Sequence, residues 1–113
     1  MAWFVKTETF TAEMAALSVE QRRLHLYAHR QWVHQEKAKG RSIHSGFLVD
    51  KYRNPGGGGL LIFSASNFQE ALEWVQNDPM ISQGLVVWSL GEWIVNCKEV
   101  FVEGSSDSNE YVD

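Results

Sequence analysis

The sequence contains one cysteine, two prolines and no long hydrophobic run. A single cysteine, Cys97, cannot form an intrachain disulfide, which excludes a disulfide-stabilised secreted scaffold. The longest apolar runs, 60–63 and 85–88, have the length of strands and fall far short of the roughly 20 residues that cross a bilayer. The first residues also lack the basic and apolar regions of a signal peptide. These absences predict a cytoplasmic protein with no membrane partner.

Positive charge is scarce as well, with 10 Lys and Arg against 14 Asp and Glu and a formal net charge of -4. Such a balance, without a basic strip, argues against nucleic acid as a partner. The length of 113 residues fits one hydrophobic core. We therefore expect a single domain over 1–103, followed by an acidic, disordered tail over 104–113.

Aromatic residues are plentiful, at 12% of the chain, with five Trp, six Phe and three Tyr. Each ring buries about 150–250 Å² when it packs, which is more than a small core needs in total. The excess predicts a second buried surface beside the core of one chain.

Hydrophobic periodicity predicts four strands and two helices, in the order strand, helix, strand, strand, helix, strand. The expected strands are 2–10, 41–50, 60–65 and 85–95, and the expected helices are 18–39 and 66–77. Ser18 and Gln21 form a capping-box pattern at the first helix start, and Gly40 follows its end. Bulges are expected at Gly46 and Gly91.

Four consecutive glycines occupy 56–59, after Asn54 and Pro55. A phosphate-binding loop would need a following helix and a Lys-Ser/Thr pair, and a strand follows here instead. We interpret 51–59 as the flexible tip of a β-hairpin.

This element order predicts an α+β, ferredoxin-like βαββαβ fold, with an antiparallel four-stranded sheet and two helices on one face. The strands nevertheless carry apolar residues on both faces, whereas a solvated face should be polar. We expect a second copy to cover the open face, giving a homodimer that pairs as a dimeric α/β barrel. The alternative cover is the chain's own loops together with residues 96–103.

Four polar residues of the first helix, Arg22, His25, His29 and Glu36, fall within about 60° of arc inside the apolar stripe. Histidine titrates nearest neutral pH and suits proton transfer. The alternative for each histidine is a hydrogen bond to a backbone carbonyl. The i, i+4 spacing of the histidines is compatible with a metal, but no Cys or His-Glu-x-x-His pattern accompanies it, so we expect no metal and no cofactor.

Three short motifs follow one another along the chain: Arg22-x-x-His25-Leu26, Glu73-Trp74-x-x-x-Asp78-Pro79-Met80, and Gly84. Together they resemble the YciI-like (YCII-related) family. The resemblance implies the ferredoxin-like fold, pairing as dimeric α/β barrels, and a His–Asp active-site dyad, which by motif is His25 and Asp78. One branch of the family is similar to a dehydrochlorinase of chlorinated hydroxyquinols, and the wider superfamily includes muconolactone isomerase.

We therefore predict an enzyme that uses His25 and Asp78 in general acid–base chemistry, an isomerisation or elimination, on a small aromatic or anionic molecule. Arg22 is expected to hold an anionic substrate group, with His29 and Trp32 also contacting substrate. For Asp78 the alternative is a turn residue before proline. The alternative function is a non-catalytic dimer that binds a small ligand or a partner protein.

Overall fold

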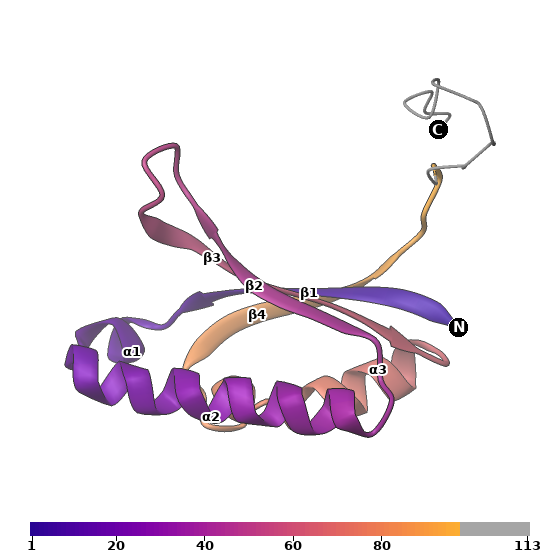
Figure 1. The fold of residues 1–113 in the computed structure, drawn as a ribbon, viewed down its shortest axis with the longest axis horizontal. Coiled ribbons are helices and arrows are strands. Elements are labelled where there is room, and N and C mark those ends of the chain that lie inside the picture. Colours follow the sequence, from indigo (N-terminus) through magenta and orange to yellow (C-terminus); the bar gives the residue numbers. More distant parts are fainter. Residues whose placement is uncertain (98–113) are drawn as a thin grey trace.

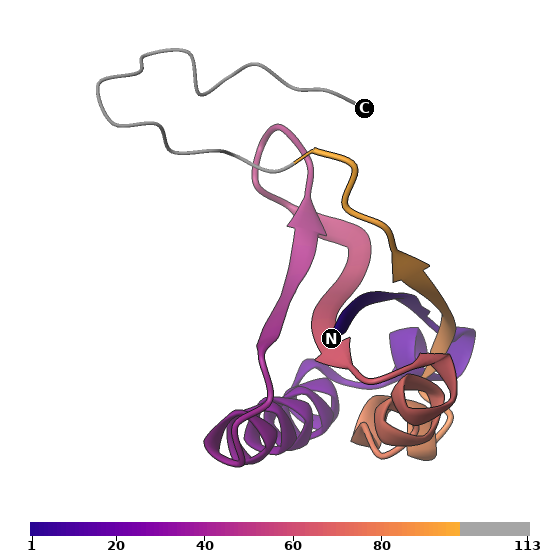
Figure 2. The same cartoon turned by 90° about the vertical axis from the view of Figure 1, so that its right-hand side faces the viewer.

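The computed structural model describes residues 1–97. Its elements, in chain order, are β1 Ala2–Phe10, α1 Ala12–Ala16, α2 Val19–Ala38, β2 Ile43–Val49, β3 Pro55–Ala65, α3 Phe68–Val75, α4 Pro79–Ser82 and β4 Val86–Trp93. The sheet has the strand order β2-β3-β1-β4, and neighbouring strands are antiparallel. The helices lie together on one side of this sheet (Figures 1 and 2). The predicted α+β, ferredoxin-like architecture is confirmed.

The main core lies between the inner face of the sheet and helices α2 and α3. Phe4 on β1 and Phe63 on β3 are fully buried, with ring centroids 6.0 Å apart. Trp74 of α3 packs against Phe63, with ring centroids 4.5 Å apart and the ring planes tilted by 44°. A second buried group, around Met14 and Met80, joins the short helices α1 and α4 to β4. Helices α2 and α3, and the short helices α1 and α4, therefore all pack against the same face of the sheet.

Helix α2 begins and ends where its local signals predict. The Ser18 hydroxyl accepts from the Gln21 amide at 3.1 Å, and the Gln21 side chain accepts from the Ser18 amide at 3.2 Å. Gly40 follows the C-cap with φ 102°, a left-handed conformation that favours glycine. Local hydrogen bonds therefore define both ends of α2.

The β2–β3 hairpin differs from the prediction. The glycines belong to β3, which begins at Pro55, and the turn is confined to residues 50–54. The Asp50 carboxylate accepts from the backbone amides of Tyr52 and Asn54, at 2.8 and 3.0 Å, so the turn is held by its own hydrogen bonds.

The two predicted bulges are not at the glycines. Gly46 pairs with Leu60 and Gly91 pairs with Val5 in regular register. The irregularity lies between Phe47 and Val49 instead. Glycine is accommodated here by ordinary ladder hydrogen bonding, so its presence alone does not mark a bulge.

Two short helices add detail that the periodicity missed. Residues 12–16, which lie outside the predicted helices and strands, form α1, whose N-cap Thr11 accepts from the Met14 amide at 3.1 Å. Helix α3 starts at Phe68, after its N-cap Asn67, whereas the predicted helix starts at residue 66. Pro79 does not simply end a helix, because it occupies the first turn of α4, where its missing N–H costs nothing.

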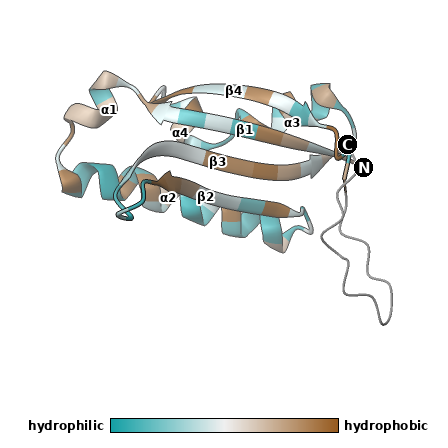
Figure 3. Ribbon diagram, turned by 90° about the horizontal axis from the view of Figure 1, so that it is seen from above, coloured by the Kyte–Doolittle hydropathy of each residue, from teal (hydrophilic) through white to brown (hydrophobic). Residues whose placement is uncertain are grey.

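The face of the sheet opposite the helices remains open in the single chain. Strand alternation places Trp3 and Val5 on this outer face, where they are half-buried. Val87 and Trp93, on β4, are 64% and 47% exposed. Figure 3 views the sheet from this side and shows hydrophobic segments on β2, β3 and β4. The outer face therefore carries apolar side chains without a cover from residues 1–97.

The predicted tail, 104–113, lies outside the described residues, as does 98–103. Among residues 1–97 no helix combines the length and apolar character that a membrane span requires.

Candidate functional site

Asp78 lies at the junction of α3 and α4 and is completely buried. Its Oδ1 accepts from the Met80 amide at 3.0 Å, so the carboxylate is the N-cap of α4. Two side chains from distant segments complete its surroundings. Lys6 Nζ donates to Oδ2 at 2.9 Å, and His29 Nδ1 lies 2.9 Å from Oδ1.

Lys6 reaches this position because strand alternation directs it to the same face as Phe4. It is only 1% exposed, and its ammonium also contacts the carboxylate of Glu8, two residues later on the same face of β1. A buried ammonium requires paired anions to offset its lost hydration. Lys6 therefore bridges the buried carboxylate of Asp78 and the partly buried carboxylate of Glu8.

The surroundings of Asp78 act on its pKa in opposite directions. Burial alone raises the pKa of the carboxyl, because it disfavours the charged form. The hydrogen bond from His29 and the positive charge of Lys6 outweigh burial and hold the pKa of Asp78 below its ordinary value. Asp78 is consequently ionised at neutral pH.

An ionised carboxylate can only accept hydrogen bonds, so the neutral His29 ring carries its proton on Nδ1. The other nitrogen, Nε2, is then an acceptor and lies 3.1 Å from the Ser45 hydroxyl of β2. The His29 side chain is 16% exposed and Ser45 is exposed, so this edge of the ring faces solvent between α2 and β2. The arrangement can take up a proton at Nε2 while Asp78 stabilises the resulting cation.

The histidine paired with Asp78 is His29, one helical turn after His25. The side-chain partners of the Asp78 carboxylate among residues 1–97 are Lys6 and His29, and His25 is half-buried in the same stripe of α2. The i, i+4 spacing gives both histidines the same helix face, and only the position of α4 along α2 selects between them. The motif therefore predicts the face of α2 on which the paired histidine lies, but not which of the two histidines contacts Asp78.

The remaining predicted contacts have structural partners. The Arg22 guanidinium donates to the carbonyls of Ala15 and Leu17, the first at 3.1 Å, and so satisfies the end of α1. Trp32 packs against Trp74 at 4.7 Å between ring centroids, and lies 6.3 Å from the His29 ring.

Sequence reasoning missed Lys6 and Ser45 as members of the site. The signal for Lys6 was present, because a lysine alternating with Phe4 on a strand faces inward and must find an anion there. Ser45 carried no such signal, since serine is common in exposed strands.

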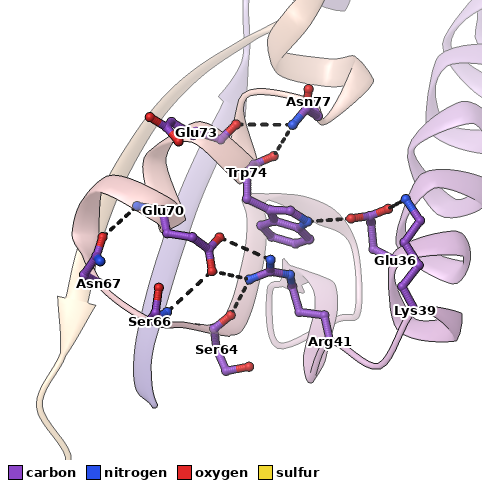
Figure 4. A network of polar contacts seen from close by, with 10 residues as sticks. All are labelled: Glu36, Lys39, Arg41, Ser64, Ser66, Asn67, Glu70, Glu73, Trp74 and Asn77. Carbon is purple, nitrogen blue, oxygen red and sulfur yellow. Dashed lines mark hydrogen bonds and ion pairs between the residues drawn. The ribbon is translucent and has the colours of Figure 1, made fainter.

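A second polar network joins the C-terminal end of α2 to α3 (Figure 4). Arg41 lies 4.4 Å from the Trp74 ring centroid and donates to the Ser64 carbonyl at 2.6 Å and to Glu70 at 3.2 Å. On the other side, the Trp74 indole donates to Glu36 at 2.7 Å. This network accounts for Glu36, the fourth polar residue of the stripe, as a packing residue.

Hydrogen bonds from Lys39 and from Trp74 hold the pKa of Glu36 below its ordinary value. An acid whose ionised form is already bound in this way is a poor proton donor at neutral pH. Of the two networks, the one around Asp78 is the one that sets a histidine beside a carboxylate.

Two shallow cavities, of about 270 and 280 Å³, lie away from the His29 ring. The first adjoins the Arg41 network, and the second lies over the start of β3 beside Glu8 and Trp88. Within the described residues, no three His, Cys, Asp or Glu side chains are grouped closely enough to hold a metal.

Comparisons with known proteins place these features in context. Residues 4–94 match the family described as the YCII-related domain. Among solved structures, the chain is similar to 5-chloro-2-hydroxyhydroquinone dehydrochlorinase from Burkholderia phenoliruptrix AC1100, in complex with 2,5-dihydroxybenzoquinone. The sequence identity is 21%, the TM-score is 0.62, and the match covers 81% of this chain and 93% of that chain. A search of curated proteins found no match.

Proposed function

The chain belongs to the family of YCII-related domains, and on that premise we propose that it is an enzyme of general acid–base chemistry. The reaction is an elimination or isomerisation of a small aromatic molecule. Asp78 and a histidine of α2 carry the chemistry. In this proposal His29 takes the role that the motif assigns to His25.

The observation that carries this proposal is the 2.9 Å contact between His29 Nδ1 and Asp78 Oδ1. Asp78 fixes the ring orientation and the proton position, so that Nε2 acts as the base. Proton transfer from a weakly acidic group of the substrate gives a cationic ring beside an ionised carboxylate. Ser45, 3.1 Å from Nε2, marks where a substrate hydroxyl would bind.

The structural neighbour supports the reaction class. Its name describes a dehydrochlorinase of a substituted hydroquinone, and its bound ligand is a dihydroxybenzoquinone. Loss of hydrogen chloride is an elimination that begins with, or includes, removal of a proton from the substrate. A histidine base held by a carboxylate supplies that step without a cofactor.

The contacts of Arg22 bear on the charge of the substrate. Its guanidinium is used by the carbonyls of Ala15 and Leu17, so the expected clamp for an anionic group is occupied elsewhere. This favours a neutral aromatic substrate over an anionic one.

The test is chloride release from 5-chloro-2-hydroxyhydroquinone and related chlorinated hydroquinones, together with thermal-shift binding of 2,5-dihydroxybenzoquinone. We expect His29→Gln to lower turnover by about 10²-fold or more, as removal of a positioned base does. His25→Gln, one turn away, is the matched comparison and should retain most activity. Loss of activity in His25→Gln alone would return the role of base to His25, and no His-dependent turnover or binding across the panel would overturn the proposal.

We also propose that the outer sheet face pairs with a second copy to form a homodimer. The support is the row of apolar side chains on this face, including Val87 and Trp93, which no residue of 1–97 covers. Isologous pairing would bury the same residues twice. Sedimentation at micromolar concentration should give twice the chain mass of 12.9 kDa, and a mass near 12.9 kDa would exclude the dimer.

The same face supports the second candidate function, a non-catalytic module that binds a small ligand or a partner protein. Binding of a ligand that is unaffected by His29→Gln would favour this candidate. The proposed location of either form is the cytoplasm, and fractionation of cells expressing the full chain tests it.

A further inference from the structure

We propose that Lys6, held in place by Glu8, is a positioning residue that sets the orientation of the Asp78 carboxylate and the charge around the His29 ring. The inference rests on the proposed function, in which Asp78 and His29 act together. It concerns residues that the family motifs do not include.

The contacts of Lys6 define this role. Its ammonium is buried between the carboxylates of Asp78, at 2.9 Å, and Glu8. Lys6 donates to Oδ2 of Asp78, while His29 and the Met80 amide use Oδ1. Each oxygen therefore has its own donors, and rotation of the carboxylate would break at least one contact.

Glu8 reaches Lys6 because a glycine stands opposite it. Gly59 is the register partner of Glu8 on β3. A Cβ at position 59 would lie 2.9 Å from Glu8 Cγ and 3.2 Å from Glu8 Cδ, too close for the present side-chain position. Gly59, in the glycine-rich start of β3, thus leaves room for the Glu8 side chain. This role differs from both phosphate binding and a flexible hairpin tip.

The charges make the proposal distinguishable from a purely structural one. The linked side chains Lys6, Glu8 and Asp78 together carry a net charge of -1, and Asp78 joins this group to His29. Removal of the Lys6 charge leaves -2, which favours the protonated ring, and removal of the Glu8 charge leaves zero, which disfavours it. A residue that only supports packing has no reason to act in opposite directions.

The other groups around His29 are few among the described residues. They are Asp78 from α4, the neutral Ser45 from β2, and the residues of its own helix stripe, Arg22, His25 and Glu36. Hydrogen bonds from Lys39 and Trp74 hold the pKa of Glu36 below its ordinary value, so Glu36 keeps its charge through the neutral range, and Arg22 donates to backbone carbonyls. Repeating the titration in His25→Gln removes the contribution of the neighbouring His25 ring.

The experiment is an NMR pH titration of the imidazole signals of the full chain, with the His29 signals identified by their loss in His29→Gln. We expect the titration midpoint of the His29 ring to rise in Lys6→Met and to fall in Glu8→Gln, each by about one pH unit relative to the unmodified protein. Lys51→Met and Glu92→Gln change the net charge equally at exposed positions, and should leave the midpoint within about 0.2 units because exposed charges are screened.

Gly59→Ala provides an independent test that changes no charge. The added methyl group should displace the Glu8 carboxylate and move the midpoint in the same direction as Glu8→Gln. If Lys6→Met does not fold, Glu8→Gln and Gly59→Ala still decide the outcome. Midpoints that stay unchanged, or that move in the same direction in Lys6→Met and Glu8→Gln, overturn the proposal.

The titration also separates this inference from the proposed function. Opposite shifts without any turnover would sustain the positioning role and remove the enzyme. Turnover that depends on His29, with no shift in these variants, would sustain the enzyme and remove the role of Lys6.

Discussion

Lys6 and Asp78 lie 72 positions apart in the sequence and form an ion pair of 2.9 Å whose side chains are at most 1% exposed. This contact connects β1 to the start of α4. It also places two opposite charges in the interior, where neither is stable without the other.

Removal of the Lys6 charge should therefore destabilise the fold. Lys6→Met leaves the buried Asp78 carboxylate and the partly buried Glu8 carboxylate without their cation, and we expect the free energy of unfolding to fall by about 3–5 kcal/mol. Urea denaturation at neutral pH measures it. Lys51→Met, at an exposed turn position, should change stability by less than about 0.5 kcal/mol. An equal effect of the two substitutions would show that the buried pair is not a special source of stability.

The pH dependence of stability should report Asp78. Burial acts to raise its pKa, but the His29 hydrogen bond and the Lys6 charge lower it overall. A folded-state pKa below the unfolded value means that Asp78 contributes stability in full above about pH 4, and that the contribution is lost as the pH falls through the lowered pKa.

Chemical denaturation between about pH 2 and pH 5 tests this linkage. Asp78→Asn keeps the shape of the side chain without the titration, so its stability should be lower at neutral pH and depend less on pH in this range. Parallel profiles for the two proteins would contradict the assignment.

The element order and the ends of α2 could be predicted because their signals are local. The Ser18 capping box and Gly40 act within one turn of the chain and need no tertiary contact. The antiparallel four-stranded sheet with its helices on one face followed from the order of the elements, whereas the strand order β2-β3-β1-β4 is known only from the structure.

The pairing in the site could not be predicted in the same way. His25 and His29 have equivalent helical positions, and only the packing of α4 against α2 brings Asp78 to the second of them. The contact between His29 and Asp78 spans 49 residues and depends on sheet register and helix placement together. Local sequence carries neither quantity.

Arg22 should matter for stability and not for ligand binding. Arg22→Gln removes charged donors from the carbonyls of Ala15 and Leu17, and we expect a loss of about 1–3 kcal/mol. Hydrogen exchange in α1 should rise, because its last turn loses these partners. If stability were unchanged and the binding of anionic aromatic probes weakened, Arg22 would regain the substrate-binding role that its position in the motif predicts.

The Trp74 indole should control the ionisation of Glu36. Trp74→Phe keeps most of the ring contact with Phe63 and Trp32 but removes the N–H that donates to Glu36 at 2.7 Å. Since hydrogen bonds from Lys39 and from Trp74 lower the pKa of Glu36, losing one of them should move that pKa back toward its ordinary value, which a carboxyl NMR titration measures.

The same substitution should cost about 1–2 kcal/mol of unfolding free energy at neutral pH, because the Glu36 carboxylate loses a partner. In the background of Glu36→Gln, Trp74→Phe should have a smaller effect, and the difference gives the coupling between the two residues. Additive losses in this double-mutant cycle would mean that Trp74 acts through ring packing and its stacking with Arg41 alone. The bond to Glu36 would then be dispensable for the connection between α2 and α3.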